Sequence, residues 1–192
     1  DGYNLRQING WIKRYNNSIV DECANLKKTA KWLLNNIPKE SSASLIHNDY
    51  KYDNIVLNSK NISEIISVLD WEMSTIGDPL MDLGTTLGYW INHNDPDFMK
   101  KLNLNPSSVD GNPTRDQFVN QYALKSKINI NNLTFYYVYG LFKIAVIIQQ
   151  IYFRYNKGLT KDMRFKNLNL WIKELGLIAS QSIDKKKLDN LF

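Results

Sequence analysis

Apolar side chains recur every three or four residues over much of the chain, as they do on the buried face of a helix. Together with capping residues and prolines, this spacing predicts helices over residues 4–16, 21–35, 79–90, 115–126, 132–155 and 165–183. Two of the predicted starts carry a specific signal. Asp78-Pro79 places an N-cap residue before a proline at the first helical position, and Thr114-Arg-Asp-Gln117 is a capping box.

The pattern changes between the second and third predicted helices. Runs rich in β-branched residues at Ser44–Ile46, Asn54–Leu57 and Ile65–Leu69 are separated by polar turns and predict three short strands. Residues 92–113 read as a polar loop that exceeds the usual length of a connection, which favours a functional loop. The expected fold class is therefore mainly α with a few short β-strands (α+β).

The most apolar stretch, residues 135–153, raises the possibility of a membrane span. Lys143, Gln149 and Gln150 interrupt it, and this favours a buried central helix over a span. Residues 1–20 have no apolar run of the kind found in signal peptides. We therefore expect no contact with a membrane.

Composition excludes several classes of site. The chain has 192 residues, of which 43% are hydrophobic, so it can fill a core. Cys23 is its single cysteine, which excludes an internal disulfide and a zinc site built from several thiolates. Only two histidines are present, so a cluster of imidazoles is excluded as well. Scarce cysteine suggests a reducing compartment, and we expect a cytoplasmic protein.

Charge is unevenly distributed along the chain. The formal net charge is +5, yet the segment from His47 to Asp82 carries seven acidic and two basic side chains. A dense acidic segment within a basic chain favours a cation site over a nucleic-acid groove. We therefore expect no nucleic-acid partner.

The acidic segment contains side chains suited to phosphoryl transfer. His47, Asp49 and Asn54 form the pattern H-x-D-x-x-x-x-N between two predicted strands, and Asp70 ends the next strand. Asn54 and Asp70 offer the oxygen ligands that Mg²⁺ prefers. Asp49 is then free to accept a proton from a hydroxyl, and Lys51 can reach a phosphate held by the metal.

Two stretches carry a resemblance to a known family. They are Leu45-Ile-His-Asn-Asp-Tyr-Lys-Tyr-Asp-Asn54 and Val68-Leu-Asp-Trp-Glu-Met-Ser-Thr-Ile-Gly-Asp-Pro-Leu-Met-Asp-Leu83. The chain resembles the aminoglycoside phosphotransferase-like kinases, in particular the phosphotransferase domains associated with acyl-CoA dehydrogenases. The resemblance implies a protein-kinase-like fold and the cofactors ATP and Mg²⁺.

The resemblance also implies a role for each matching residue. Asp49 would be the catalytic base, and Asn54 and Asp70 would bind Mg²⁺. Asp82 would brace the catalytic loop by accepting backbone hydrogen bonds, and His47 would pack that loop against the metal-binding turn. One position departs from the family pattern, because Asn48 stands where the family usually has glycine.

A second departure concerns the extent of the domain. The chain offers no Gly-rich phosphate-covering loop followed by a strand lysine paired with a helix glutamate. We therefore expect residues 1–192 to be the C-terminal lobe alone, inactive by itself, with the N-terminal lobe elsewhere in the same protein. Residues 45–83 would hold the catalytic loop and metal site, and residues 84–183 would bind the acceptor.

Simpler structural roles compete for several of these residues. Asp70 ends an apolar run, so we expect it to be buried and in need of a partner. Asp78 is better explained as a helix cap than as a ligand, and Asp53 as a turn former. Glu72 could support the metal ligands or bind a second metal, but a solvated surface carboxylate explains it at least as well. An exposed position is the default for Lys51.

Three functions remain open at this point. The leading one is an ATP-dependent small-molecule O-kinase whose acceptor is a hydroxyacyl-CoA or a similar hydroxylated metabolite. Aminoglycosides are less favoured, because their pockets need many carboxylates and residues 85–183 are basic overall. The alternatives are a non-catalytic kinase-like binding module and a metal-dependent phosphohydrolase. A dinuclear hydrolase site would lack ligands in a chain with two histidines.

Overall fold

The computed structural model describes residues 2–102 and 104–192. The helices are α1 (Tyr3–Asn17), α2 (Ala24–Asn35), α3 (Pro79–Tyr89), α4 (Asp97–Lys101), α5 (Arg115–Ser126), α6 (Leu133–Asn156) and α7 (Leu168–Lys185). The strands are β1 (Ser44–Ile46), β2 (Ile55–Asn58), β3 (Asn61–Val68) and β4 (Thr75–Gly77). Residue 1 of the predicted domain and residue 103 of the predicted loop lie outside the described residues.

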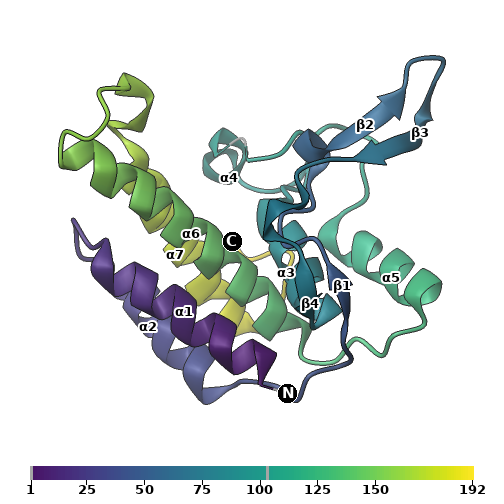
Figure 1. Ribbon diagram of the computed structural model, residues 1–192, viewed down its shortest axis with the longest axis horizontal. Coiled ribbons are helices and arrows are strands. Elements are labelled where there is room, and N and C mark those ends of the chain that lie inside the picture. The colour runs from purple at the N-terminus through teal and green to yellow at the C-terminus, as the bar shows by residue number, and fades with distance from the viewer. Residues whose placement is uncertain (1, 103) are drawn as a thin grey trace.

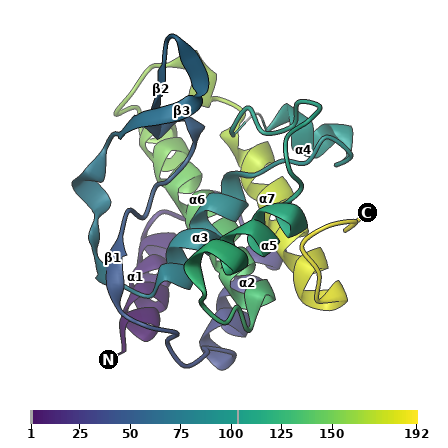
Figure 2. The same cartoon turned by 90° about the vertical axis from the view of Figure 1, so that its right-hand side faces the viewer.

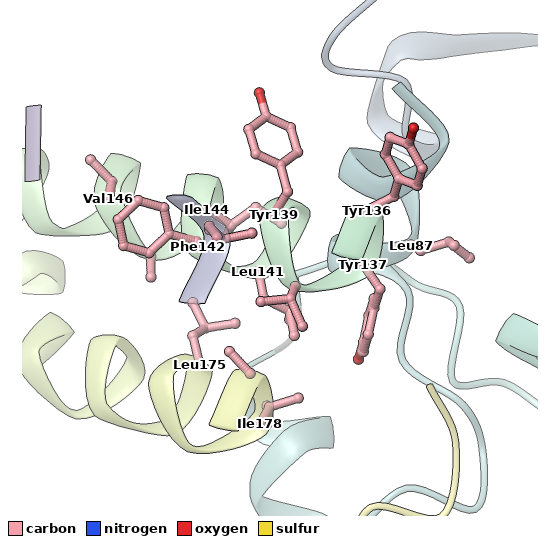
Figure 3. Packing of buried hydrophobic residues seen from close by; sticks show 14 of the residues in the cluster. Leu87, Tyr136, Tyr137, Tyr139, Leu141, Phe142, Ile144, Val146, Leu175 and Ile178 are labelled. Atoms are coloured by element: carbon pink, nitrogen blue, oxygen red, sulfur yellow. The ribbon is translucent and has the colours of Figure 1, made fainter. Parts of the chain in front are cut away.

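Helix α6 is the centre of the molecule. It packs against α1, α2, α3 and α7, and most of its residues from Phe135 to Gln149 are buried. Figure 1 shows α1, α2, α6 and α7 running side by side, with α3 and the strands at one end of this bundle. Side chains from α3, α6 and α7 meet in the core (Figure 3). The helix is apolar on nearly all sides because neighbours surround it.

Two glycines allow α3 and α6 to cross in direct contact. A Cβ atom added to Gly84 would lie 2.1 Å from the carbonyl oxygen of Tyr136, and one added to Gly140 would lie 2.0 Å from the carbonyl oxygen of Gly84. No side chain fits at either position without separating the helices. This close crossing sets the distance between α6 and the loop that α3 supports.

Length and hydropathy alone would allow α6 to cross a membrane, and it is the one such helix within the described ranges. However, 78% of its most apolar window is buried inside the protein. The buried central helix expected from the polar interruptions accounts for its composition.

The strands form two separate antiparallel pairs. β1 pairs with β4, and β2 pairs with β3 in a hairpin that begins with Ile55 opposite Val68. The hairpin projects from the helical body, as Figures 1 and 2 show from two sides. Most of β3 is consequently exposed, including Ile62, Ile65 and Ile66.

The expected fold class is confirmed, and several boundaries differ. Helices α2 and α7 begin three residues later than predicted, at Ala24 and Leu168. The third strand is longer than the predicted 65–69, because hairpin pairing extends it back to Asn61. Strand β4 was not predicted, because its three residues are too few to show the alternation of apolar and polar side chains that marks a strand. The predicted loop over 92–113 contains the short helix α4.

The predicted helix starts differ in how they are capped. The Asp78 side chain accepts a hydrogen bond from Leu80 N, and both halves of the capping box at Thr114 and Gln117 are present. Asn132 occupies the N-cap position of α6, but its side chain makes no capping hydrogen bond, because its backbone is left-handed with φ 55°.

Candidate active site

The loop that follows β1 is held by a carboxylate on α3. Asp82 Oδ2 accepts a hydrogen bond from the backbone N–H of His47 at 2.8 Å, and Oδ1 accepts one from Asn48 at 2.7 Å. These are the backbone hydrogen bonds that the family resemblance implies for Asp82. The two bonds fix the start of the loop relative to α3.

Asn48 adopts a left-handed conformation, with φ 68°. Glycine reaches this region freely, and asparagine is among the few other residues that tolerate it. The departure from the family glycine is therefore accommodated by the same backbone turn. The side chain adds a contact that glycine lacks, because Nδ2 donates to the carbonyl of Met73 at 3.0 Å.

The Asp49 carboxylate is oriented by two neighbours. Asn54 Nδ2 donates to Asp49 Oδ2 at 3.1 Å and to the Asp49 backbone carbonyl at 2.8 Å. Lys51 Nζ lies 3.0 Å from the same Oδ2, and the Asp49 side chain keeps 17% of its surface exposed. Lys51 is only 21% exposed, so the expected default of an exposed lysine is wrong.

Asn54 and Asp70 lie at the same end of the hairpin, opposite its turn. Asn54 directly precedes β2, Asp70 follows the end of β3, and the backbone N–H of Leu69 donates to the Asn54 carbonyl at 2.8 Å. The amide nitrogen of Asn54 is used by Asp49. Its carboxamide oxygen is therefore the atom suited to a cation.

The expectation that Asp70 is buried is wrong. The residue is exposed and left-handed, with φ 61° and ψ 55°. The apolar run before it belongs to the projecting hairpin and not to a central strand, so its burial did not follow from its composition. The Asp70 carboxylate is therefore open to solvent, whereas the Asn54 side chain at the same end of the hairpin is buried.

His47 connects the two halves of this arrangement. Its Nδ1 accepts the backbone N–H of Asp49 at 3.2 Å, so the proton resides on Nε2, which donates to the carbonyl of Leu69 at 2.8 Å. The ring is 4% exposed and lies 4.8 Å from the Trp71 ring, centroid to centroid. His47 therefore ties the Asp49 loop to the turn that carries Asp70.

The donor set fits Mg²⁺ and does not fit zinc. No group of three or more His, Cys, Asp or Glu side chains able to hold a metal occurs in residues 2–102 and 104–192. Mg²⁺ needs few protein ligands, because water and phosphate oxygens complete its octahedron. One carboxamide oxygen and one carboxylate at the hairpin end satisfy that requirement.

Other acidic side chains of this segment take structural positions. Asp78 is 1% exposed and accepts hydrogen bonds from Asn4, Ser41, Leu80 and Tyr136. It therefore joins α1, α3 and α6 as well as capping a helix. Asp53 and Glu72 are exposed.

Part of the chain matches the model of a known family. Residues 1–109, more than half of the chain, match the model of the phosphotransferase enzyme family. The chain belongs to this phosphotransferase family.

Two of the similar proteins are acyl-CoA dehydrogenase family members. This phosphotransferase is 32% identical over 189 residues to acyl-CoA dehydrogenase family member 11 of Homo sapiens and 29% identical over 154 residues to family member 10 of Mus musculus. The alignments cover 94% and 79% of this chain, but 24% and 14% of those relatives. The chain thus spans at most about a quarter of their length.

A crystal structure from Ralstonia eutropha JMP134, of a protein assigned as an aminoglycoside phosphotransferase, has the same fold. The TM-score is 0.81 at 25% sequence identity, and the match covers 95% of this chain and 56% of that one. The likeness agrees with a kinase-like α+β fold for this phosphotransferase.

Two side chains near Asp49 were given no role in the site from sequence. Tyr89, at the end of α3, lies beside Asp49. Burial raises the pKa of the Tyr89 hydroxyl most, and the negative charge of Asp49 raises it further. Lys51 Nζ lies 4.9 Å from the centre of the same ring. Lys143 of α6 donates to the backbone carbonyl of Asn48. Its place in an apolar run was visible, but its partner was not.

A groove of about 230 Å³ opens beside the Asp49 loop of the phosphotransferase. Its walls come from β1, α3 and α5 and are largely aromatic and aliphatic: Leu45, Tyr50, Leu83, Phe118 and Tyr122. The hydroxyl of Thr86 in this groove donates to the carbonyl of Tyr50 at 2.9 Å. The groove therefore adjoins the residue that follows Asp49.

Proposed function

We propose that this phosphotransferase is an ATP- and Mg²⁺-dependent small-molecule O-kinase that transfers the γ-phosphate to a substrate hydroxyl. One observation supports this proposal most directly. The Asp49 carboxylate is oriented by Asn54 Nδ2 and Lys51 Nζ, and Asn54 also lies beside Asp70 at the hairpin end. The proposed base, its lysine partner and the two proposed metal ligands thus come from one loop and the adjoining end of the hairpin, which supports phosphoryl transfer.

Asp49 is the proposed base. Its Oδ2 is held by Asn54 and Lys51, Tyr89 lies beside the same carboxylate, and this carboxylate would accept a hydroxyl proton from the acceptor. Lys51, paired with Asp49, would also contact the transferring phosphate. Asn54 and Asp70 would hold Mg²⁺, which when bound supplies charge neutralisation and orientation of the ATP phosphates.

The groove supports an acceptor with an apolar portion. Its one carboxylate, Asp82, already accepts two backbone hydrogen bonds, so it offers little to a polycationic aminoglycoside. The relatives are named acyl-CoA dehydrogenases, which associates this branch with acyl thioesters. We propose a hydroxyacyl-CoA or a similar hydroxylated metabolite as the acceptor, with its apolar portion against Phe118 and Tyr122.

We also propose how the nucleotide is enclosed and where the protein acts. The exposed hairpin face would form one wall of a nucleotide cleft, and an N-terminal lobe in the same protein would form the other. We propose a cytoplasmic protein with a nucleotide and a small molecule as partners, and without nucleic-acid or membrane partners.

The proposal is tested by following phosphate from labelled ATP in the full-length protein. A hydroxylated acyl-CoA, the same acyl-CoA without its hydroxyl, and an aminoglycoside are compared as acceptors. Label transferred to the hydroxylated acyl-CoA alone supports the proposal. Equal release of inorganic phosphate with and without acceptors indicates a hydrolase, and neither transfer nor release indicates a binding module.

A further inference from the structure

Lys143 is a charged side chain inside the apolar body. It lies on the central helix α6 and is 1% exposed. Its Nζ donates to the backbone carbonyl of Asn48 at 2.5 Å, a residue 95 positions away in the sequence. The contact therefore joins the core of the bundle to the loop that carries Asp49.

The bond completes a clamp around Asn48. Asp82 accepts the N–H of this residue, Met73 accepts its side-chain amide, and Lys143 donates to its carbonyl. With φ at 68°, the backbone here occupies a region that most residues avoid. The carbonyl belongs to the peptide that leads into Asp49, so its direction sets where the Asp49 side chain begins.

The charges around Lys143 come from several elements. Asp82 of α3 and Asp49 of the loop favour its ammonium, whereas Arg14 of α1 and Lys51 oppose it. The Trp11 ring lies 5.7 Å from Nζ. Burial outweighs the favourable charges and lowers the pKa of Lys143 to about 8. A buried ammonium of this kind costs free energy relative to an apolar side chain.

Stability therefore does not explain why a lysine occupies this position. We propose that Lys143 is a positioning residue for phosphoryl transfer, which holds the Asn48 carbonyl and thereby orients Asp49 toward the acceptor. This inference rests on the proposed function. Lys143 touches neither nucleotide nor acceptor and acts through the loop.

The test compares Lys143→Met with Gln149→Met in the full-length protein. Gln149 is a matched control, because it is also 1% exposed on α6 and donates to Tyr15 and Ser18, away from the loop. Lys143→Met is expected to lower kcat roughly 10- to 100-fold, since an error of about 1 Å at a reacting group costs up to 10²-fold. KM for ATP and acceptor should stay close to wild type.

The pH dependence gives a second test, because the unfolding free energy and kcat of the wild type should change in opposite directions. Lys143 has a pKa of about 8 in the folded protein against an ordinary value of 10.5. Between these values the unfolded chain binds more protons, so the unfolding free energy of the wild type rises with pH relative to Lys143→Met. In the same window kcat of the wild type should fall, because a neutral amine donates a weaker hydrogen bond to the carbonyl than the ammonium does.

Several outcomes would overturn the inference. They are a kcat of Lys143→Met within twofold of wild type, an equal loss in Gln149→Met, or a rise in KM without a change in kcat. If Lys143→Met does not fold, the wild-type profile decides, and a flat kcat between pH 7 and 9.5 overturns the inference. Asp49→Asn separates the two proposals: if that variant stays active, the proposed function has failed and not merely the role of Lys143.

Discussion

Asp49 is the side chain on which the proposed chemistry depends, and its carboxylate is restricted by Asn54, Lys51 and Tyr89. Asn54 and Lys51 contact the same carboxylate oxygen, while 17% of the side chain stays open to solvent. A base held in this way loses little freedom when a hydroxyl approaches. Single substitutions should therefore change either turnover or nucleotide affinity, depending on the residue replaced.

Replacing Asp49 by asparagine keeps the shape of the side chain and removes the base. We expect turnover in the full-length protein to fall roughly 10²- to 10⁴-fold, with nucleotide affinity nearly unchanged. Steady-state kinetics together with a nucleotide titration measure both quantities. Asp53→Asn is the matched control, because Asp53 is an exposed carboxylate four residues away. Wild-type turnover in Asp49→Asn would contradict the assignment.

Of the two proposed metal ligands, Asp70 should contribute more to Mg²⁺-dependent nucleotide binding than Asn54. Asp70 carries a full negative charge, whereas Asn54 offers a neutral oxygen, so Asp70→Ala should abolish Mg²⁺-dependent nucleotide binding and Asn54→Ala should weaken it less. Calorimetric titration of the full-length variants with ATP, with and without Mg²⁺, measures the difference. Glu72→Ala removes another exposed carboxylate of the same turn and should bind as wild type does. If Asp70→Ala binds ATP·Mg²⁺ normally, the metal lies elsewhere.

At the scale of elements, a buried ion network places α5 against the body. Arg115, which is fully buried, contacts both carboxylate oxygens of Asp95 at 2.7 Å and one of Asp189 at 2.8 Å. Asn92 bonds to both aspartates as well. The network joins the loop after α3, the start of α5 and the C-terminal residues. Since α5 carries Phe118 and Tyr122, it also sets the groove wall.

Arg115→Met should lower the unfolding free energy by about 3–5 kcal/mol, because it leaves Asp95 and Asp189 as uncompensated buried charges. Denaturant unfolding of the chain measures this change. Arg164→Met, which breaks an exposed pair with Asp162, is the matched control and should change stability little. A small loss in Arg115→Met would mean that water enters and solvates the network.

At the scale of the whole molecule, apolar surface gathers on the side of the proposed metal ligands. Leu57, Ile62, Ile65, Ile66 and Leu69 of the hairpin are each more than two-fifths exposed, as is Trp71 after it. Exposed apolar side chains concentrated on one element in this way are typical of an interaction surface. The helical bundle buries its own core independently of that face.

We therefore expect the 192-residue chain by itself to unfold cooperatively but to bind ATP·Mg²⁺ only at millimolar concentration or above. Of its proposed metal ligands, Asp70 is open to solvent, and the exposed hairpin would need a second wall to enclose the phosphates and position them for transfer. Thermal unfolding and calorimetric titration of the chain measure the two properties. Micromolar binding would show that the exposed hairpin face forms a complete nucleotide site.

The sequence by itself determined most of the helices, the caps at Asp78 and Thr114, and the spacing of Asp49, Asn54 and Asp70. These features depend on periodicity and on contacts between near neighbours in the chain, which a sequence displays directly. The family resemblance added expected roles for Asp82 and His47, and the structure shows the hydrogen bonds that such roles require.

Only the tertiary structure decided what surrounds these residues. An apolar run does not reveal whether its strand lies in a core or in a projecting hairpin, and for this reason the exposure of Asp70 was missed. Likewise, Lys143 and Asn48 meet because two glycines let α3 and α6 cross closely, which brings together residues 95 positions apart. Contacts of that kind arise from packing geometry, and no local pattern in the chain encodes them.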